Sequence, residues 1–348
     1  MIKELVEVIK NYQSKPVTLM EVCGTHTMAI ARLGLKDVLP NNIRIVSGPG
    51  CPVCVTHQDY IEKALLLSKH AKICTFGDLM RVPGENGTLT EAKDVTMVYS
   101  PLECVQIAIE NPDSEVVFLS IGFETTTPSV ALAVTKAAEL GILNLTFLTA
   151  NKTMPQVTET LLSADDLEID GLIYPGHVSA IEGTEFFNSA SRKFKIPGVI
   201  AGFEPVQVLV AICELLKMIE NKEFAAKNIY KTVVKEDGNH LAKQIVKKVF
   251  EPVDAEWRGF GIISRSGLGL RKEFEIFDAE KKFCLLLKDM KLYGEPAGCR
   301  CGDVLKGKIS PKECSLFGRK CSPESPIGAC MVSSEGSCAA EYRYGGLR

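Results

Sequence analysis

The most chemically reactive residues of this sequence are its cysteines. The 348 residues include 13 cysteines, and six of these fall within the last 50 residues. In a reducing compartment, thiols at this density are typically metal ligands or catalytic groups and not structural disulfides. Four cysteines with apolar neighbours are expected to be small buried residues without chemistry: Cys74, Cys104, Cys213 and Cys284. The other nine define three candidate sites.

The first candidate site is the C-x2-C pair in the stretch GPGCPVC, formed by Cys51 and Cys54. Pro52 suits the first position of a helix, where its missing N–H costs nothing. Cys51 is then expected at the helix cap with its thiolate favoured, and Cys54 lies one turn further on, which is the geometry of redox-active pairs. The alternative is one structural zinc ion held by five cysteines and histidines: Cys23, His26, Cys51, Cys54 and His57.

The second candidate site is Cys23 in EVCGTHTMAIA, between an expected strand and an expected helix. Free amides and the helix dipole at a helix start favour a thiolate. Gly24 permits the close approach of a ligand. Thr25, His26 and Thr27 supply hydrogen-bond donors around it. The stretch therefore predicts a thiolate site with polar partners.

The third candidate site is the tail, which reads C-x-C-x12-C-x6-C-x8-C-x7-C. Zinc sites usually contain C-x2–4-C knuckles, and the tail has none. Four thiolates that converge from irregular loops are typical of a [4Fe–4S] cluster. We expect four of the six cysteines as its ligands: Cys299, Cys314, Cys321 and Cys338. Cys301 and Cys330 then form a redox pair beside the cluster, although spacing leaves open whether Cys299 or Cys301 is the ligand. A zinc ribbon and three disulfides are the alternatives.

The stretch GFETTTPSVAL adds a polar turn to this set. Glu124 is its only candidate metal ligand. Thr127 is expected to cap a helix that starts at Pro128, which leaves Thr125 and Thr126 free to face a cleft. An ordinary polar helix start is the alternative.

The elements that position these residues follow an alternating pattern. From about residue 18 to 205, short apolar runs typical of strands buried on both faces alternate with helical stretches. This pattern predicts an α/β fold with two doubly wound, Rossmann-like parallel-sheet lobes, at 18–130 and 131–220. A smaller Cys-rich iron–sulfur domain is expected at 221–348, possibly with a helix at 1–17, because the tail lacks the long apolar runs of an independent core.

Composition excludes several classes of protein. The sequence is 46% hydrophobic and 24% charged, with a net charge of −3. This mild acidity gives no reason to expect nucleic acid or an anionic membrane as partner. No apolar run approaches the ~20 residues of a membrane span, and the start is a charged amphipathic pattern instead of a signal peptide. We therefore expect a cytoplasmic protein.

Four motifs together resemble one family, the [NiFe]-hydrogenase maturation factors HypD. They are CGTHT at 23–27, GPGCPVC at 48–54, GFETTTP at 122–128 and the cysteine tail at 299–338. The resemblance implies two α/β lobes with a cluster domain. It also implies a redox-active scaffold on which the Fe(CN)2CO group of the hydrogenase is assembled, and not a conventional turnover enzyme.

The resemblance assigns roles and partners to these residues. Cys23 would hold the iron together with a cysteine of a small HypC-like chaperone, and a soft thiolate suits low-spin ferrous iron. HypE, working with HypF, would deliver cyanide as a thiocyanate, and the hydrogenase large subunit would receive the product indirectly. Cys51 and Cys54 would supply two electrons, recharged through Cys301 and Cys330 and the [4Fe–4S] cluster. His26 and Glu124 are further candidate catalytic residues.

Two other functions fit the residues. A zinc-stabilised α/β binding protein would use both cysteine groups structurally. A stand-alone dithiol reductase would need Cys51 and Cys54 but not Cys23. The sequence contains no phosphate loop of the G-x4-G-K-[ST] type.

Overall fold

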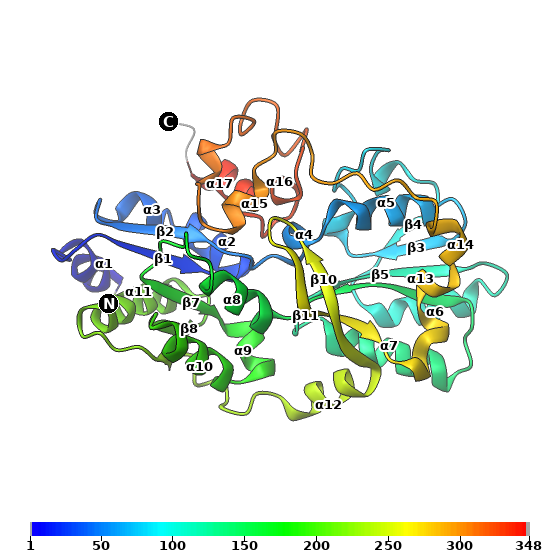
Figure 1. The fold of residues 1–348 in the computed structure, drawn as a ribbon, viewed down its shortest axis with the longest axis horizontal. Helices are drawn as coiled ribbons and strands as arrows, with labels where there is room; N and C mark the ends of the chain where they lie inside the picture. The colour runs from blue at the N-terminus through cyan, green and yellow to red at the C-terminus, as the bar shows by residue number, and fades with distance from the viewer. Residues whose placement is uncertain (1, 346–348) are drawn as a thin grey trace.

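Two parallel β-sheets lie side by side in the protein, and a small Cys-rich unit covers the place where they meet (Figure 1). The computed structural model describes residues 2–345. Both sheets carry helices on their faces, so that their strands are buried on two sides. This arrangement confirms the predicted α/β class with two parallel-sheet lobes and a Cys-rich C-terminal region.

The first sheet has five strands in the order β2-β1-β7-β8-β9, all parallel. Its strands are β1 Val17–Glu21, β2 Ile43–Ser47, β7 Gly171–Pro175, β8 Gly198–Ala201 and β9 Ala226–Asn228. Six helices accompany it: α1 Ile2–Lys10, α2 Gly24–Arg32, α3 Leu35–Val38, α9 Gly176–Glu182, α10 Glu185–Phe194 and α11 Pro205–Glu220. The apolar residues of β7 and β8 are buried without alternation, as continuous apolar runs predict.

The second sheet has four parallel strands in the order β4-β3-β5-β6. Its strands are β3 Lys72–Thr75, β4 Val95–Met97, β5 Val116–Gly122 and β6 Leu145–Asn151. The accompanying helices are α4 Pro52–Val55, α5 Gln58–Leu67, the 3-10 helices η1 Gly77–Leu79 and η2 Leu89–Glu91, α6 Pro101–Glu110 and α7 Thr127–Glu139. The next helix, α8 Met154–Leu162, leads back to the first lobe and packs on its α10. β5 and β6 pair along their whole length and form the centre of this lobe's core.

The strands are divided between the lobes differently from the predicted ranges 18–130 and 131–220. The chain forms β1 and β2, leaves to build the second sheet, and returns to the first with β7. β6, predicted in the second range, pairs instead with β5. Apolar runs identify strands but do not identify their pairing partners, because pairing joins residues about 150 positions apart, as between Leu19 and Gly171.

The predicted range 221–348 is also divided among several places. Its first strand, β9, completes the first sheet, and the helix predicted at 1–17 belongs there too, because α1 packs against α11. A long antiparallel hairpin follows, with elements α12 His240–Val249, β10 Phe250–Trp257 and β11 Gly261–Leu270. β11 packs on β6 of the second lobe and on α8.

The Cys-rich unit proper begins near residue 299. The connection to it from the hairpin contains η3 Lys272–Phe277, α13 Ala279–Lys282 and α14 Cys284–Leu287, and Cys284 in it is exposed, contrary to the expectation of a buried residue. The unit itself consists of α15 Cys301–Leu305, η4 Pro311–Glu313, α16 Ala329–Val332 and α17 Ser337–Tyr344. It packs through α17 on α2 and through α15 and α16 on α4 (Figure 1). The unit therefore touches both cysteine motifs of the N-terminal half.

Candidate functional site

The loops that follow β1 and β2 lie against each other. The two strands are parallel neighbours, with Glu21 paired to Ser47, so the segments after them emerge at the same sheet edge. The Gly24 amide donates to the Gly50 carbonyl at 2.9 Å. A Cβ atom on Gly50 would lie 2.2 Å from the Cys23 nitrogen, so only glycine permits this approach. The fold thus brings the CGTHT and GPGCPVC motifs together.

Cys23 occupies the N-cap of α2, as predicted, but its thiol is not activated there. The side chain is buried, and burial raises the pKa of Cys23 to about 12. The carboxyl groups of Glu335 and Glu21 raise it further, while the backbone amides of His26 and Thr25 work in the other direction. Burial therefore outweighs the helix-start amides that were expected to favour the Cys23 thiolate. A metal that binds here must displace the proton.

Cys51 and Cys54 form the predicted dithiol at the start of α4. Cys51 is the N-cap, Pro52 follows it at the first helical position, and the Cys51 sulfur accepts a hydrogen bond from the Cys54 amide at 3.3 Å. The two sulfurs lie 2.7 Å apart. Burial raises the pKa of Cys54 well above its ordinary value. The pair is therefore asymmetric, since Cys51 has a donor facing its sulfur and Cys54 is fully buried.

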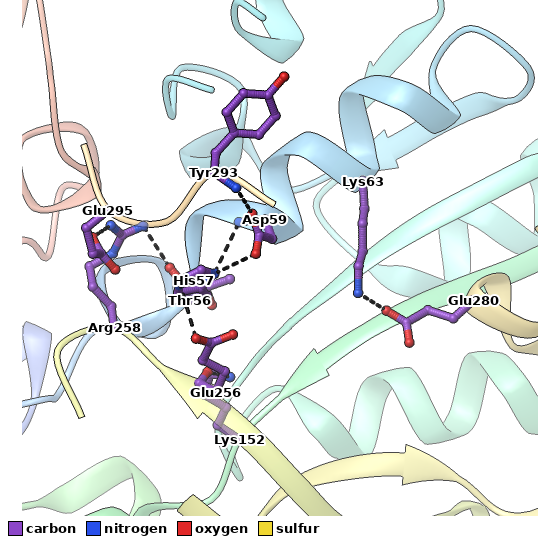
Figure 2. Close-up of polar contacts among 10 residues, drawn as sticks. All are labelled: Thr56, His57, Asp59, Lys63, Lys152, Glu256, Arg258, Glu280, Tyr293 and Glu295. Carbon is purple, nitrogen blue, oxygen red and sulfur yellow. Dashed lines mark hydrogen bonds and ion pairs between the residues drawn. The ribbon is translucent and has the colours of Figure 1, made fainter. Parts of the chain in front are cut away.

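Neither nearby histidine faces these thiols. The His26 ring contacts the Gly202 carbonyl at 3.0 Å and packs at a tilt against Phe203, and burial lowers the pKa of His26 to about 4. The His57 ring lies between two carboxylates, 3.3 Å from Asp59 and 3.4 Å from Glu256 (Figure 2). The structure therefore does not assemble the single zinc site that the alternative required from these residues.

Arg258, at the tip of the hairpin, holds the segment that follows Cys54. Its amide donates to the Val55 carbonyl at 2.8 Å, and its guanidinium donates to the Thr56 carbonyl at 2.9 Å and pairs with Glu295 (Figure 2). Only 1% of Arg258 is exposed, and its Nε atom has no hydrogen-bond partner. The buried charge acts on the thiols of Cys301, Cys330 and Cys299. A buried cation beside thiols favours their ionised forms.

The tail cysteines converge on one small cavity. It is lined by five of them together with Arg300 and apolar residues of the same unit: Cys299, Cys301, Cys314, Cys321, Cys338, Arg300, Val304, Leu316, Phe317 and Met331. The sulfurs of Cys299 and Cys301 lie 3.3 Å apart. A Cβ atom on Gly328 would lie 2.6 Å from both of these sulfurs, so a glycine is required beside them. Several cysteine thiols that face one small, largely apolar cavity are the kind of ligand set that binds an iron–sulfur cluster.

Cys330 connects this thiol group to the dithiol. It is fully buried and hydrogen-bonded to Cys301 and Cys338 on one side and to Cys54 on the other. These contacts lower the pKa of Cys330 well below its ordinary value. Cys301 and Cys330 are thus in contact, as a redox pair requires. Cys301 also contacts Cys299 and Cys338, so the pairing remains part of the proposal below.

Comparison with known proteins decides the family. The HypD family, described as the hydrogenase formation hypA family, matches residues 1–345. The hydrogenase maturation factor HypD of Escherichia coli (strain K12) is 42% identical, over 95% of this chain and 90% of the relative. That of Rhodobacter capsulatus is 41% identical, over 100% and 94%. A putative hydrogenase expression/formation protein of Methanocaldococcus jannaschii is 40% identical, over 99% and 97%. The chain belongs to the HypD family.

Within this HypD-family chain, Glu124 is hydrogen-bonded to the start of α8. Its Oε1 atom accepts a hydrogen bond from the Met154 amide at 2.8 Å, at the start of α8, and its Oε2 atom has no partner. Burial raises the pKa of Glu124 to about 8. The helix after it starts at Thr127 with Thr126 as its N-cap, one residue earlier than predicted. The hydrogen bond to Met154 therefore ties the Glu124 side chain to the start of α8.

Sequence reasoning missed several residues that line the HypD-family motifs. Glu335 accepts a hydrogen bond from Thr25 at 2.8 Å and covers Gly24. Ser333 lies 3.4 Å from the Cys51 sulfur and donates to Asp78 at 2.9 Å. The polar stretch SSEG between Cys330 and Cys338 was the available signal, because it interrupts a buried cysteine segment.

Among the residues that the structure describes, no helix has the length and apolar character needed to cross a membrane.

Proposed function

We propose that this chain is a cytoplasmic scaffold on which the Fe(CN)2CO group of [NiFe]-hydrogenase is assembled. Family membership supports a place in hydrogenase maturation. The observation that carries the mechanism is the contact of three thiol groups in one place. Cys23 lies against the loop of Cys51 through Gly24 and Gly50, and Cys54 contacts Cys330 of the tail.

Cys23 is the proposed holder of the cargo iron, shared with a cysteine of a small HypC-like chaperone. The buried thiol releases its proton when ferrous iron binds, which makes loading depend on the metal and prevents unwanted thiolate chemistry beforehand. Soft thiolate ligands suit this iron. The backbone amides of His26 and Thr25, at the start of α2, face the sulfur and can donate to cyanide nitrogens.

Cys51 and Cys54 are the proposed electron source for cyanide transfer. A thiocyanate, R–S–CN, carried by a HypE-like donor that works with a HypF-like partner, is attacked at sulfur by one thiolate. The S–C bond breaks, cyanide leaves to iron and a mixed disulfide forms. The second thiol then displaces R–S⁻, so that the dithiol becomes a disulfide, two electrons have been transferred and two protons are released. The asymmetry of the pair assigns the attack to Cys51 and the displacement to Cys54.

The tail thiols fit a [4Fe–4S] cluster, which supplies single electrons when bound. Cys314, Cys321 and Cys338 are the proposed ligands together with Cys299, and Cys301 pairs with Cys330. Cys330 contacts Cys54 directly, so a thiol exchange from this pair can restore the dithiol. Serine variants of Cys299 and Cys301 identify the fourth ligand, because only the ligand variant loses iron.

Anaerobic infrared spectroscopy of the chain co-purified with the HypC-like chaperone tests the proposal. Cyanide and carbonyl stretching bands are expected for the wild type and no bands for Cys23→Ala, while Cys51→Ala keeps iron without cyanide bands. Bands that persist in Cys23→Ala contradict the iron assignment. Metal analysis distinguishes the classes: about four iron and four sulfide per chain support the cluster, whereas zinc without iron supports the zinc-stabilised binding protein.

A further inference from the structure

Ser333 of the Cys-rich unit reaches into the dithiol from outside both motifs. Its hydroxyl oxygen lies 3.4 Å from the Cys51 sulfur, and only 1% of the residue is exposed. We infer that Ser333, held in place by Asp78, is the positioning residue that takes the proton of Cys51 and then stabilises its thiolate. This inference rests on the proposed role of the dithiol, and it names the residues that select the attacking sulfur.

The position of the Ser333 hydroxyl is fixed by partners from two parts of the fold. It donates to the Oδ2 atom of Asp78, in η1 after β3, at 2.9 Å. It also accepts a hydrogen bond from the Glu335 amide at 3.2 Å. The hydroxyl oxygen is therefore held in place when the third partner, Cys51, changes its charge, and only the hydroxyl proton changes partner. The short turn between α16 and α17 therefore holds the Ser333 hydroxyl in a fixed position next to the Cys51 sulfur.

The two cysteines differ in the donors that face them. The Cys51 sulfur accepts a hydrogen bond from the Cys54 amide at 3.3 Å and donates to the Ser333 hydroxyl at 3.4 Å, which can donate back to the sulfur once the thiol has lost its proton. The Cys54 sulfur has other sulfurs as its side-chain neighbours, those of Cys51 and Cys330. A buried thiolate is stabilised by hydrogen-bond donors. Negative charge is therefore accommodated at Cys51 and not at Cys54.

The three groups can pass a proton without changing their total charge. In the resting state the Cys51 thiol donates to Ser333, and Ser333 donates to the Asp78 carboxylate. A shift of both protons gives a Cys51 thiolate, a serine hydroxyl that donates to it, and a protonated Asp78 that donates to Ser333. The other charged or titratable groups nearest to these three are Cys54, Cys330 and Glu335. Asp78 is only partly buried, so it can exchange its proton with water.

The test is the pH dependence of Cys51 alkylation by iodoacetamide, measured by peptide mass spectrometry on the anaerobically purified full chain. Ser333→Ala is expected to slow the reaction at pH 7 about tenfold relative to the rate at pH 10, as loss of one hydrogen bond to a charged group predicts. Dividing by the rate at pH 10 removes any change in reagent access. Ser333→Thr keeps the hydroxyl and is expected to restore the wild-type profile, while Asp78→Asn is expected to slow the neutral reaction.

The matched control is Ser334→Ala. Ser334 is exposed and lies 3.5 Å from the same Asp78 oxygen, without the contact to Cys51. Its profile is expected to match the wild type. An unchanged profile in Ser333→Ala overturns the inference, as does faster neutral alkylation in Asp78→Asn, which would make the carboxylate a simple repulsive charge. The assay needs no partner protein. Cyanide bands in Cys51→Ala would overturn the dithiol role alone, and an unchanged profile would overturn only the role of Ser333.

Discussion

Cys54 and Cys330 are in direct hydrogen-bond contact although 275 residues separate them, and both side chains are fully buried. Cys54 belongs to the helix that follows the first sheet's β2, and Cys330 belongs to α16 of the Cys-rich unit. The contact joins the candidate dithiol to the candidate cluster cavity through Cys301. Thiol exchange needs sulfurs in contact, so this is the one route between the two groups that the described contacts provide.

Replacement of Cys330 by serine is expected to interrupt this route. After anaerobic reduction with dithionite, recovery of the Cys51–Cys54 dithiol should slow by about tenfold or more, because a hydroxyl cannot form a mixed disulfide. Thiol trapping and mass spectrometry measure the recovery. Iron and sulfide content should be unchanged. Cys284→Ser is the control, since Cys284 is exposed and outside the cysteine group. Loss of iron in Cys330→Ser would instead make Cys330 a ligand.

Gly50→Ala is expected to separate the two motif loops. The added Cβ atom would lie within 2.5 Å of three backbone atoms of Val22 and Cys23, so the backbone must move at a cost of about 1–3 kcal/mol. Thermal unfolding should show this loss, and co-purification with the HypC-like chaperone should yield less iron. Gly77→Ala is the control, because its Cβ atom would meet only the flexible Met97 side chain. Equal melting temperatures for the two variants would contradict the close approach.

Glu124→Gln is expected to change the pH dependence of stability. The pKa of Glu124 is raised to about 8 by burial, above the ordinary value of 4.5. The folded chain therefore keeps a proton that the unfolded chain releases in this window, so Glu124 lowers the free energy of unfolding as the pH rises from 4.5 to 8. The amide variant should match the wild type near pH 4.5 and be more stable by up to about 5 kcal/mol at pH 8.5, since each pKa unit of the shift corresponds to about 1.4 kcal/mol.

Urea unfolding of the full chain at the two pH values measures this difference. Glu139→Gln, at an exposed position of α7, is the control and should show no pH-dependent change. Equal destabilisation of Glu124→Gln at both pH values would mean that the hydrogen bond to Met154 outweighs the burial of charge.

Arg258→Gln is expected to lower the reduction potential of the iron–sulfur cluster proposed for the tail cysteines. The buried guanidinium acts on Cys299, Cys301 and Cys330, and a nearby cation favours the more negative, reduced state. We expect a shift of roughly tens of millivolts to more negative potential, as for other changes of charge around such centres. Redox titration followed by electron paramagnetic resonance measures it. Arg265→Gln, an exposed change, is the control. An unchanged potential would mean that Arg258 has only a structural role, through its hydrogen bond to the Thr56 carbonyl.

The sequence by itself determined the local structure and the family. Continuous apolar runs predicted the buried strands, and Pro52 after Cys51 predicted the cap of α4, because both depend on neighbouring residues. The tertiary structure alone decided which strands share a sheet, since pairing of β1 with β7 joins distant segments. It also decided the ionisation of Cys23, because burial is a property of the whole fold. The contacts of Ser333 with Cys51 and of Cys330 with Cys54 likewise exist only after the Cys-rich unit has packed on both lobes.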